Sequence, residues 1–445
     1  MSTRRILVLL SAAALWLATA PVLAADSQGK DENPNVSTGQ AIKTDPKAMD
    51  SSALRDGGKK GVYCVTAFGA KGDSKTDDTA SFQKALDAAA KDGGGIVFVP
   101  TGNYMIKSHL AIPEDVALEG TFQAPTNNAY SGSTLLAVEG KGDADGEAFI
   151  VLRSSSTLKG IAISYPEQDN REPVPYPWTI RSRGDNCSIV NVLVVNPWQA
   201  VDFGNFGSGR HFINGLYGQP LHTGIYVDRC ADVGRIQNVH FWPFWSVGLK
   251  DYMAQNATAF IFGRTDWEFV DNCFCIFYRY GFRFGDFGDG PGNVVITKSG
   301  SDIGPTAVLV ENCQTHAGIV WTNCQFMAGI DVRKTNTGPV KFSNCGFWGI
   351  ETTTNHAKIR GSGQVIFNEC HFTGWDQKNE GQPAIFADGI GLTVSSCDFM
   401  DADHQQIALG ENSRATIIMG NRLRGGAKIE NQSKGKVEIG LNVEE

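Results

Sequence analysis

The chain has 445 residues, a formal net charge of −8, and charged residues make up 19% of it. This length is sufficient for one large domain with a continuous core. The mildly acidic charge argues against a protein that binds nucleic acid through a basic surface.

Residues 1–24 have the pattern of a secretory signal peptide. Arg4 and Arg5 form a basic start, residues 6–20 an apolar run, and residues 22–24 a cleavage site. The run is too short for a membrane anchor, so we expect export to a periplasm or the extracellular space, with no membrane span after cleavage. Residues 25–60 are polar and predict a flexible leader. The folded domain is expected over residues 61–445.

The segment that follows residue 61 predicts a helix between strands. Asp77, Asp78 or Thr79 can cap the helix, because a side-chain oxygen accepts from its free N–H groups. Apolar residues at helical spacing follow over residues 82–90, and three glycines at 93–95 end the helix. We expect this helix to cover the open edge of the first strands.

The rest of the chain repeats a short apolar pattern with a period near 24. From residue 324 the copies follow at steps of 21, 25, 27 and 24 residues. They are Cys324-Gln325-Phe326, Asn344-Cys345-Gly346-Phe347, Cys370-His371-Phe372, Cys397-Asp398-Phe399 and Asn421-Arg422-Leu423. Looser copies begin at residue 161, and Val294-Val295-Ile296 predicts a further one. Such a repeat indicates stacked short strands whose alternate residues face the interior.

A second register, a small residue followed by an apolar one, recurs in the same part of the chain. Its members include Ala200-Val201, Gly224-Ile225, Gly248-Leu249, Gly281-Phe282, Gly329-Ile330, Gly349-Ile350 and Ala384-Ile385. No helical pattern separates the strands, so they stack by coiling. The two registers together predict a parallel β-helix of about eleven turns.

Residues 62–120 resemble the N-terminal module of the pectate-lyase-like superfamily, through motifs that include Gly102-Asn103-Tyr104 and Leu118-Glu119-Gly120. The branch in question contains rhamnogalacturonases, polygalacturonase-related proteins and uronate epimerases. The resemblance implies an all-β, single-stranded right-handed parallel β-helix with an N-terminal capping helix, and an activity on polysaccharides that are often acidic. The polygalacturonase motifs Asn-Thr-Asp, Gly-His-Gly and Arg-Ile-Lys are absent. No catalytic residue can therefore be carried over by motif.

The ten cysteines are expected to be mostly free thiols. Most of them occupy interior positions of the repeat, where they act as small apolar residues. Parallel neighbouring strands aim their sulfurs badly for a disulfide. The chain has no CxxC pair, which argues against a structural zinc site.

The turns between residues 161 and 273 include the longest steps, of 31 and 34 residues. Longer steps indicate projecting loops, and loops often carry function. Alternation predicts that Phe241 and Phe274 belong to the core. We expect Trp242 and Trp245 to form part of a groove wall for sugar rings.

The second register also predicts an outward-facing ladder. If Val201 and its counterparts point inward, then Asp202, Tyr226, Lys250 and Arg283 point outward. Asp228 lies one outward step beyond Tyr226, which puts Asp202 and Asp228 roughly 8 Å apart. That separation suits the acid and base of an inverting glycosidase.

We therefore predict that Asp202 and Asp228 are catalytic. Lys250 and Arg283 are predicted to bind a sugar carboxylate, and Tyr226 to contact substrate. His211, His222 and Arg229 lie in neighbouring corners and are expected to line the same groove. Four reserve carboxylates are Asp251, Asp266, Glu268 and Asp271. The structural alternative is that this face carries mixed charges only to prevent edge pairing.

The main functional prediction is a secreted enzyme of the glycoside hydrolase kind whose partner is a polysaccharide. The alternative is a lyase or uronate epimerase, in which Lys250, Arg283, Tyr226 or His222 assists proton abstraction. No metal ligand and no cofactor is predicted, although a lyase could use calcium. A second alternative is a non-catalytic glycan-binding or surface β-helix. The sequence does not indicate the glycan or the oligomeric state.

Overall fold

The computed structural model describes residues 61–124, 128, 130, 132–350 and 353–445. The signal peptide and leader predicted for residues 1–60 lie outside the described residues. The described chain consists of parallel strands, two α-helices and two short 3-10 helices. Within these residues, no helix is both long and apolar enough to cross a membrane.

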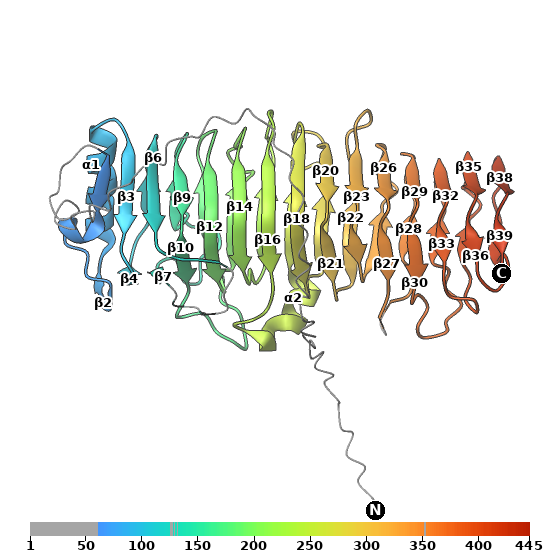
Figure 1. Cartoon of the computed structure of the whole chain (residues 1–445), viewed down its shortest axis with the longest axis horizontal. Coiled ribbons are helices and arrows are strands. Elements are labelled where there is room, and N and C mark those ends of the chain that lie inside the picture. The colour runs from blue at the N-terminus through green and yellow to red at the C-terminus, as the bar shows by residue number, and fades with distance from the viewer. Residues whose placement is uncertain (1–60, 125–127, 129, 131, 351–352) are drawn as a thin grey trace, which may run out of the picture. The chain divides into compact units, whose positions relative to one another are not determined.

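The strands form a coil in which each turn adds to two parallel sheets (Figure 1). The second sheet has 13 strands, one from each turn except the first (β1 and β2) and the last (β38 and β39). They are β5 (Leu110–Ile112), β8 (Ile150–Leu152), β11 (Trp178–Ser182), β13 (Gln199–Phe203), β15 (Thr223–Val227), β17 (Thr258–Phe262), β19 (Tyr280–Phe284), β22 (Thr306–Val310), β25 (Gly329–Val332), β28 (Ala357–Ile359), β31 (Ile385–Ala387), β34 (Ile407–Leu409) and β37 (Ile429–Asn431). The coil thus has more turns than the eleven predicted, because the turns of β5 and β8 lack the repeated motif.

The first sheet has 26 strands, which form two rows that lie side by side. One row contains β1 (Val62–Cys64), β3 (Gly95–Val99), β6 (Val116–Gly120), β9 (Thr157–Lys159), β20 (Val294–Thr297), β23 (Ile319–Thr322), β26 (Val340–Ser343), β29 (Val365–Asn368), β32 (Leu392–Ser395), β35 (Thr416–Met419) and β38 (Val437–Gly440). The other row contains β2 (Asp73–Asp77), β4 (Gly102–Ile106), β7 (Ser133–Ala137), β10 (Ile161–Ser164), β21 (Gly300–Asp302), β24 (Gln325–Phe326), β27 (Gly346–Trp348), β30 (His371–Thr373), β33 (Asp398–Phe399), β36 (Arg422–Leu423) and β39 (Val443–Glu444).

In the central turns the two rows merge into four long strands. These are β12 (Ser188–Val195), β14 (Phe212–Gly218), β16 (Arg235–Phe241) and β18 (Glu268–Ile276). The chain bends at a left-handed asparagine in three of them, such as Asn238 with φ 55° and Asn272 with φ 53°. Asparagine tolerates this conformation better than most residues. The Asn272 amide donates to the Asn238 side chain over 2.7 Å, so the bends are tied from turn to turn.

The interior of the coil consists of stacked apolar side chains, as the alternation predicts. The rings of Phe347 and Phe372 lie 4.8 Å apart and those of Phe372 and Phe399 also 4.8 Å apart, each pair nearly parallel. Cys324, Cys345 and their counterparts in the next turns fill the neighbouring interior position. Every cysteine is a free thiol in this structure, and all but Cys64 are buried.

Helix α1 (Thr79–Lys91) packs at the N-terminal end of the coil (Figure 1). It buries Phe82, Leu86 and two alanines against the first strands, which confirms the predicted capping helix. The Asp78 carboxylate does not cap the helix. Its oxygens instead accept from the backbone N–H groups of Lys71 and Gly72, over 2.7 and 3.0 Å. Asp78 therefore holds the loop before the helix. A 3-10 turn, η1 (Val65–Phe68), precedes this loop.

The long step between residues 239 and 273 contains an inserted helix. The 3-10 turn η2 (Val247–Leu249) leads into α2 (Lys250–Asn256), and β17 follows. Gly248-Leu249 is thus not a strand of the second register, so that part of the prediction is wrong. Gly349-Ile350 likewise lies outside the strands, because β27 ends at Trp348 and β28 begins only at Ala357. Two small–apolar pairs in loops mimic the strand motif.

Candidate functional site

The second sheet brings Asp202 and the segment before Asp228 onto one outer face. β13 and β15 are neighbours, with Asp202 opposite Tyr226. The Asp202 side chain is only 1% exposed. Its carboxylate accepts from Arg181 Nε over 2.6 Å, from two backbone N–H groups and from the Asn205 amide. The prediction that this carboxylate faces an open groove is therefore wrong.

Asp228 is buried in the same way, with 1% of its surface exposed. It accepts from the Tyr226 hydroxyl over 2.9 Å and from the backbone N–H groups of Arg229 and Arg264. Burial and this hydrogen bond raise the pKa of Tyr226. The Tyr226 ring packs between Trp178 and Phe287, at centroid distances of 6.4 and 5.9 Å.

The loops that follow the strands therefore fill the predicted catalytic face. A catalytic role for Asp202 and Asp228 stays an untested prediction, and their saturated hydrogen bonds favour a structural role. The two arginines that were predicted to contact substrate are also paired. Arg229 Nε donates to Asp289, and Arg283 Nε donates to Glu311 over 2.7 Å.

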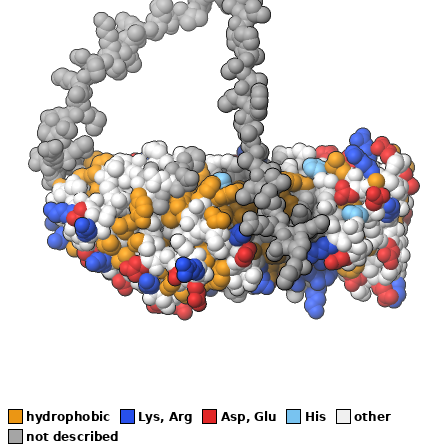
Figure 2. Space-filling view, turned by 90° about the horizontal axis from the view of Figure 1, so that it is seen from below, with side chains coloured by type: hydrophobic (Ala, Val, Ile, Leu, Met, Phe, Trp, Pro, Cys, Tyr) orange, Lys and Arg blue, Asp and Glu red, His pale blue; other side chains and the backbone are white. Residues whose placement is uncertain are grey.

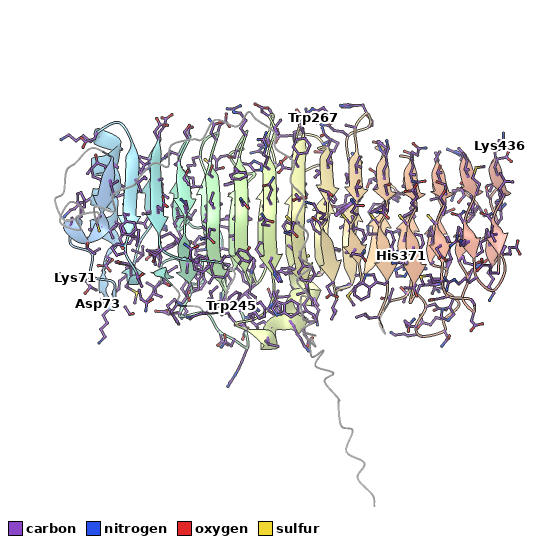
Figure 3. All side chains as sticks on the ribbon, in the orientation of Figure 1. Lys71, Asp73, Trp245, Trp267, His371 and Lys436 are labelled. Carbon is purple, nitrogen blue, oxygen red and sulfur yellow. The ribbon has the colours of Figure 1, made fainter. Side chains whose placement is uncertain are left out.

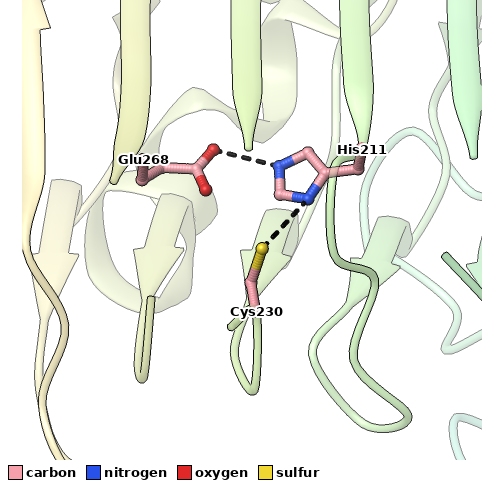
Figure 4. Close-up of side chains that lie close together, drawn as sticks. All are labelled: His211, Cys230 and Glu268. Carbon is pink, nitrogen blue, oxygen red and sulfur yellow. Dashed lines mark hydrogen bonds and ion pairs between the residues drawn. The ribbon is translucent and has the colours of Figure 1, made fainter. Parts of the chain in front are cut away.

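His211 is fully buried rather than groove-lining (Figure 4). Its Nε2 lies 3.0 Å from Glu268 Oε1, and its Nδ1 lies 2.8 Å from the Ser208 carbonyl and 3.7 Å from Cys230 Sγ. Burial alone would lower the pKa of His211, but Glu268 and Cys230 raise it well above 6.5. His, Cys and Glu are a possible ligand set for a metal ion. One ligand atom from each residue lies within 4.8 Å of the others, but both ring nitrogens already have protein partners, the Ser208 carbonyl and Glu268, so we interpret the cluster as a buried ion pair.

His222 is half-buried in the corner beside α2. Its ring stacks on Trp198 at 4.7 Å, and Nδ1 lies 3.0 Å from the Thr223 hydroxyl. Burial lowers the pKa of His222, which favours the neutral form. Trp198 in turn contacts Tyr252 of α2 at 6.1 Å. His222 therefore helps to position α2 through Trp198.

Lys250 does not belong to the outward ladder, because α2 carries it. Ile261 of β17 occupies the ladder position between Tyr226 and Arg283. Lys250 instead lines a hollow at the edge of the coil, where its ammonium lies 5.8 Å from the centre of the Phe277 ring.

Two hollows adjoin on this side of the coil, and we call them together the Asp302 groove. The first, of about 340 Å³, lies on the outer face of the first sheet, and the second, of about 500 Å³, lies under α2. Consecutive residues line the two hollows: Asp302 and Met327 line the first, and Ile303 and Ala328 line the second. The first is lined by Asn272, Cys273, Phe274, Lys298, Ser299, Gly300, Ser301, Asp302, Asn323, Gln325, Met327 and Trp348, and the second by Lys250, Asp251, Ala254, Phe277, Ile303, Gly304, Pro305, Ala328, Gly329, Thr353, Thr354 and Asn355.

The first hollow has aromatic sides and a bare floor. Phe274 lies on one side and Trp348, which is 40% exposed, on the other. The floor between them is Gly300, where an added Cβ would lie 2.5 Å from the Gln325 carbonyl oxygen. Gln325 Oε1 accepts from the Trp348 indole over 3.0 Å, which fixes the ring. Aromatic sides with amide groups suit the apolar face and hydroxyl groups of a sugar ring.

Among the described residues, Asp302 is the one carboxylate that lines the first hollow, and the next residue, Ile303, lines the second. Burial raises the pKa of its carboxyl, and the hydrogen bond from the Ile303 backbone N–H, at 2.7 Å, opposes this only in part. Lys298, in the same hollow, pairs with Asp271 at 2.8 Å. The groove thus holds a carboxylate with a raised pKa and the cations Lys250 and Lys298.

An aromatic cluster continues from the groove toward the N-terminal turns. Trp242 stacks near Phe274 at 6.4 Å, and His240 meets Phe274 edge-on at 5.1 Å. Phe244, 49% exposed, packs on Trp242 at 5.3 Å. Trp245 lies at the lower edge of the coil, near α2 (Figures 1 and 3), and hydrophobic side chains gather over the middle of the face seen from below (Figure 2).

This cluster changes two sequence predictions. Trp242 is half-buried beside the groove, whereas Trp245 packs against a small apolar cluster that includes Leu193. Phe241 is buried in the core as predicted, but Phe274 faces outward into the first hollow. The bend at Asn272 shifts the alternation by one residue, which places Phe274 outside.

Sequence reasoning missed Asp302, although a signal for it existed. Val294-Val295-Ile296 predicted a hidden turn, and β20 confirms it. Extending that turn by the repeat would have placed Gly300 and Asp302 at the outward positions that Gln325 and Met327 occupy one turn later. The groove itself depends on α2, whose position the repeat cannot predict.

The fold is that of the pectate-lyase-like class. Residues 62–164 match the family model described as rhamnogalacturonase A/epimerase, pectate lyase-like. The resemblance predicted from residues 62–120 is confirmed, and the match extends to residue 164.

Among curated relatives, alginate lyase 7 of Azotobacter vinelandii is 59% identical over 44 residues, which is 10% of this chain and 5% of that protein. Mannuronan C5-epimerase AlgE5 of the same organism is 52% identical over 44 residues, 10% of this chain and 4% of that protein. Depolymerase 1, capsule KN3-specific, of Klebsiella phage KN3-1 is 34% identical over 171 residues, 37% of this chain and 21% of that protein. The chain thus spans about a fifth or less of each relative.

Two solved structures share the fold. The N-terminal fragment of bacteriophage Phi29 gene product 12 is 14% identical and has a TM-score of 0.59, covering 86% of this chain and 70% of that chain. DFA-IIIase from Arthrobacter chlorophenolicus A6, without its lid, is 12% identical and has a TM-score of 0.51, covering 85% of this chain and 99% of that chain. At this identity the likeness shows a common architecture.

Proposed function

We propose that this protein acts on an acidic polysaccharide by removing the proton beside a uronate carboxyl group, as a lyase or an epimerase. The observation that carries the proposal is the Asp302 groove, whose two hollows are lined by a carboxylate with a raised pKa, by two lysines and by aromatic rings. The family of the N-terminal module and the alginate lyase and mannuronan epimerases among the relatives support an acidic substrate.

Asp302 is the proposed base. A carboxylate is a better proton acceptor when its pKa is raised toward the working pH. Asp302 Oδ1 is held by the Ile303 backbone N–H, and among the described residues Oδ2 has no hydrogen-bond partner. That oxygen is available to receive a proton from a bound sugar.

Lys250 is the proposed partner of the uronate carboxylate. Removal of the neighbouring proton places negative charge on the carboxyl group, so a nearby cation stabilises the transition state. Among the described residues, Lys250 has no carboxylate in ion-pair contact, whereas Lys298 is held by Asp271. Lys250 can therefore accept a substrate carboxylate without breaking an existing ion pair.

The same first step serves both reactions. In a lyase, the bond to the leaving glycosidic oxygen then breaks, that oxygen takes up a proton, and an unsaturated uronate remains. In an epimerase, a proton returns to the opposite face of the same carbon. Hydrolysis, the main sequence prediction, would need two carboxylates that face an open groove, and Asp202 and Asp228 do not.

The test is incubation with polymannuronate, polyguluronate and polygalacturonate. A lyase gives the ultraviolet absorbance of the unsaturated uronate, and an epimerase changes the sugar configuration seen by NMR without shortening the chain. Asp302→Asn should lower the rate about a hundredfold or more, the usual effect of losing a general base. The exposed Asp403→Asn is the matched control and should retain the rate. New reducing ends without unsaturation would instead indicate hydrolysis and overturn the proposal.

A further inference from the structure

A third hollow lies at the opposite ends of two strands, β22 and β25, that border the Asp302 groove. β22 and β25 begin beside Pro305 and Gly329, which line the hollow under α2. They end beside Glu311 and Arg333, which line a separate hollow of about 470 Å³. A five-residue strand spans about 16 Å, so the two hollows lie about that far apart.

We call this third hollow the cationic hollow. It is lined by Glu311, Arg333, Lys334, Thr335 and Arg360. Three cations and one carboxylate give the lining a net charge of +2, although the whole chain carries −8. The lining is therefore positively charged although the protein as a whole is negatively charged.

The two acidic groups at this site are already used. Glu311 accepts from Arg283 at 2.7 Å, outside the lining. Asp331, beneath the hollow, accepts from Arg333 Nε at 3.1 Å and from Arg360 at 2.5 Å. Asp331 thus orients both guanidinium groups without reaching Lys334.

Donors remain available in the lining. Arg360 uses one terminal nitrogen for Asp331, and its Nε is buried without a hydrogen-bond partner. Among the described residues, Lys334 has no ion-pair partner. The Arg360 side chain is 39% exposed, and its other terminal nitrogen has no partner among the described residues, so this nitrogen and the Lys334 ammonium are the donors open to a bound oxyanion. Guanidinium groups also bind oxyanions through two parallel hydrogen bonds.

We propose that the cationic hollow binds an oxyanion, either a carboxylate of a polyuronate chain or a free phosphate-type anion. The chemistry is shared, because both present two or more oxygens to Arg360 and Lys334. The carboxylate reading rests on the proposed function, since a uronate chain bound in the Asp302 groove would have to cross the outer face of β22 and β25 to reach the hollow. The phosphate reading is independent of it.

The experiment measures binding rather than turnover. Isothermal titration at low ionic strength, where surface charges are least screened, would use the full chain carrying Asp302→Asn to prevent reaction. The probes are an oligouronate, the same oligosaccharide with its carboxyl groups reduced to alcohols, and inorganic phosphate. The variants are Lys334→Gln and Arg360→Gln, with Lys436→Gln as the control for the loss of one exposed charge far along the coil.

Each of the two variants should weaken binding of the charged probe about tenfold, the usual effect of losing one charge-assisted hydrogen bond. Lys436→Gln should leave it unchanged, and the reduced oligosaccharide should not respond to either variant. Loss of oligouronate binding alone identifies a uronate site, and loss of phosphate binding identifies a free-anion site. Unchanged affinity for both probes in both variants would overturn the proposal.

This result is separable from the proposed catalysis. If Asp302→Asn keeps full turnover while Lys334→Gln loses affinity, the assignment of Asp302 fails and the cationic hollow stands. Thermal unfolding of each variant distinguishes lost binding from misfolding, and Lys334 is the safer position because its side chain is exposed and unpaired among the described residues.

Discussion

The buried imidazole of His356 should make the stability of the coil depend on pH. The side chain is fully buried beside Phe347, Phe372 and Trp375. Burial lowers its pKa from 6.5 to about 4, and the hydrogen bond with the Thr373 carbonyl, at 2.8 Å, opposes this only in part. The folded protein therefore keeps a neutral ring at pH values where the unfolded chain binds a proton.

The sign and size follow from proton linkage. Because the pKa of the folded state is the lower one, the stability from the neutral ring is complete above pH 6.5 and is lost as the pH falls from 6.5 to about 4. One pKa unit corresponds to about 1.4 kcal/mol, so the full loss is about 3 kcal/mol. His211 does not contribute over this window, because its raised pKa keeps it protonated in the folded state.

Urea unfolding at pH 7 and at pH 4.5 would measure this effect. His356→Gln keeps a donor for the Thr373 carbonyl but cannot be protonated. Between pH 7 and pH 4.5, the free energy of unfolding of the wild type should therefore fall by about 2 to 3 kcal/mol more than that of His356→Gln. The exposed His316→Gln is the matched control and should behave as the wild type. An equal pH dependence in wild type and His356→Gln would refute the reasoning.

Three further predictions follow from packing and exposure. Ellman's reagent should label at most one of the ten cysteines in the folded protein and all ten after denaturation, because nine are buried; fast labelling of several would contradict the packed interior. Gly234→Ala should lower the free energy of unfolding by about 2 to 4 kcal/mol, because the added Cβ would lie 2.1 Å from Glu268 Oε2. The control is Gly440→Ala, whose added Cβ meets nothing within 4 Å and which should therefore change the free energy of unfolding little. Equal melting temperatures would disprove that clash. Trp348→Ala should weaken oligouronate binding about fivefold, and Trp267→Ala, also exposed, should not; equal effects would remove Trp348 from the groove.

The architecture could be predicted because each turn repeats the same physical requirement. Residues such as Cys345 and Phe347 must face the interior in every turn, and a strand period of two then fixes which neighbours face outward. The capping helix could also be predicted from the sequence, because its apolar residues have helical spacing.

The site could not be predicted from the same periodicity. Asp202 lies in β13 and Asp228 directly follows β15 in the next turn, but loops supply N–H groups to both carboxylates, from Gly204 to Asp202 and from Arg264, in the loop after β17, to Asp228. Such contacts depend on loop conformation rather than on period. Likewise, Lys250 reaches a groove only because α2 replaces a strand, and Gly248-Leu249 imitates the strand motif.

The central claim, proton abstraction beside a uronate carboxyl group, is tested most directly by following that hydrogen. A polyuronate carrying deuterium on the carbon beside the carboxyl group would be incubated with the wild type, Asp302→Asn and Asp403→Asn, and the label released to water would be measured by NMR. We expect release by the wild type and Asp403→Asn, whether the product is an unsaturated or an inverted sugar, and about a hundredfold slower release by Asp302→Asn. Shortening of the chain with the label fully retained would contradict the account.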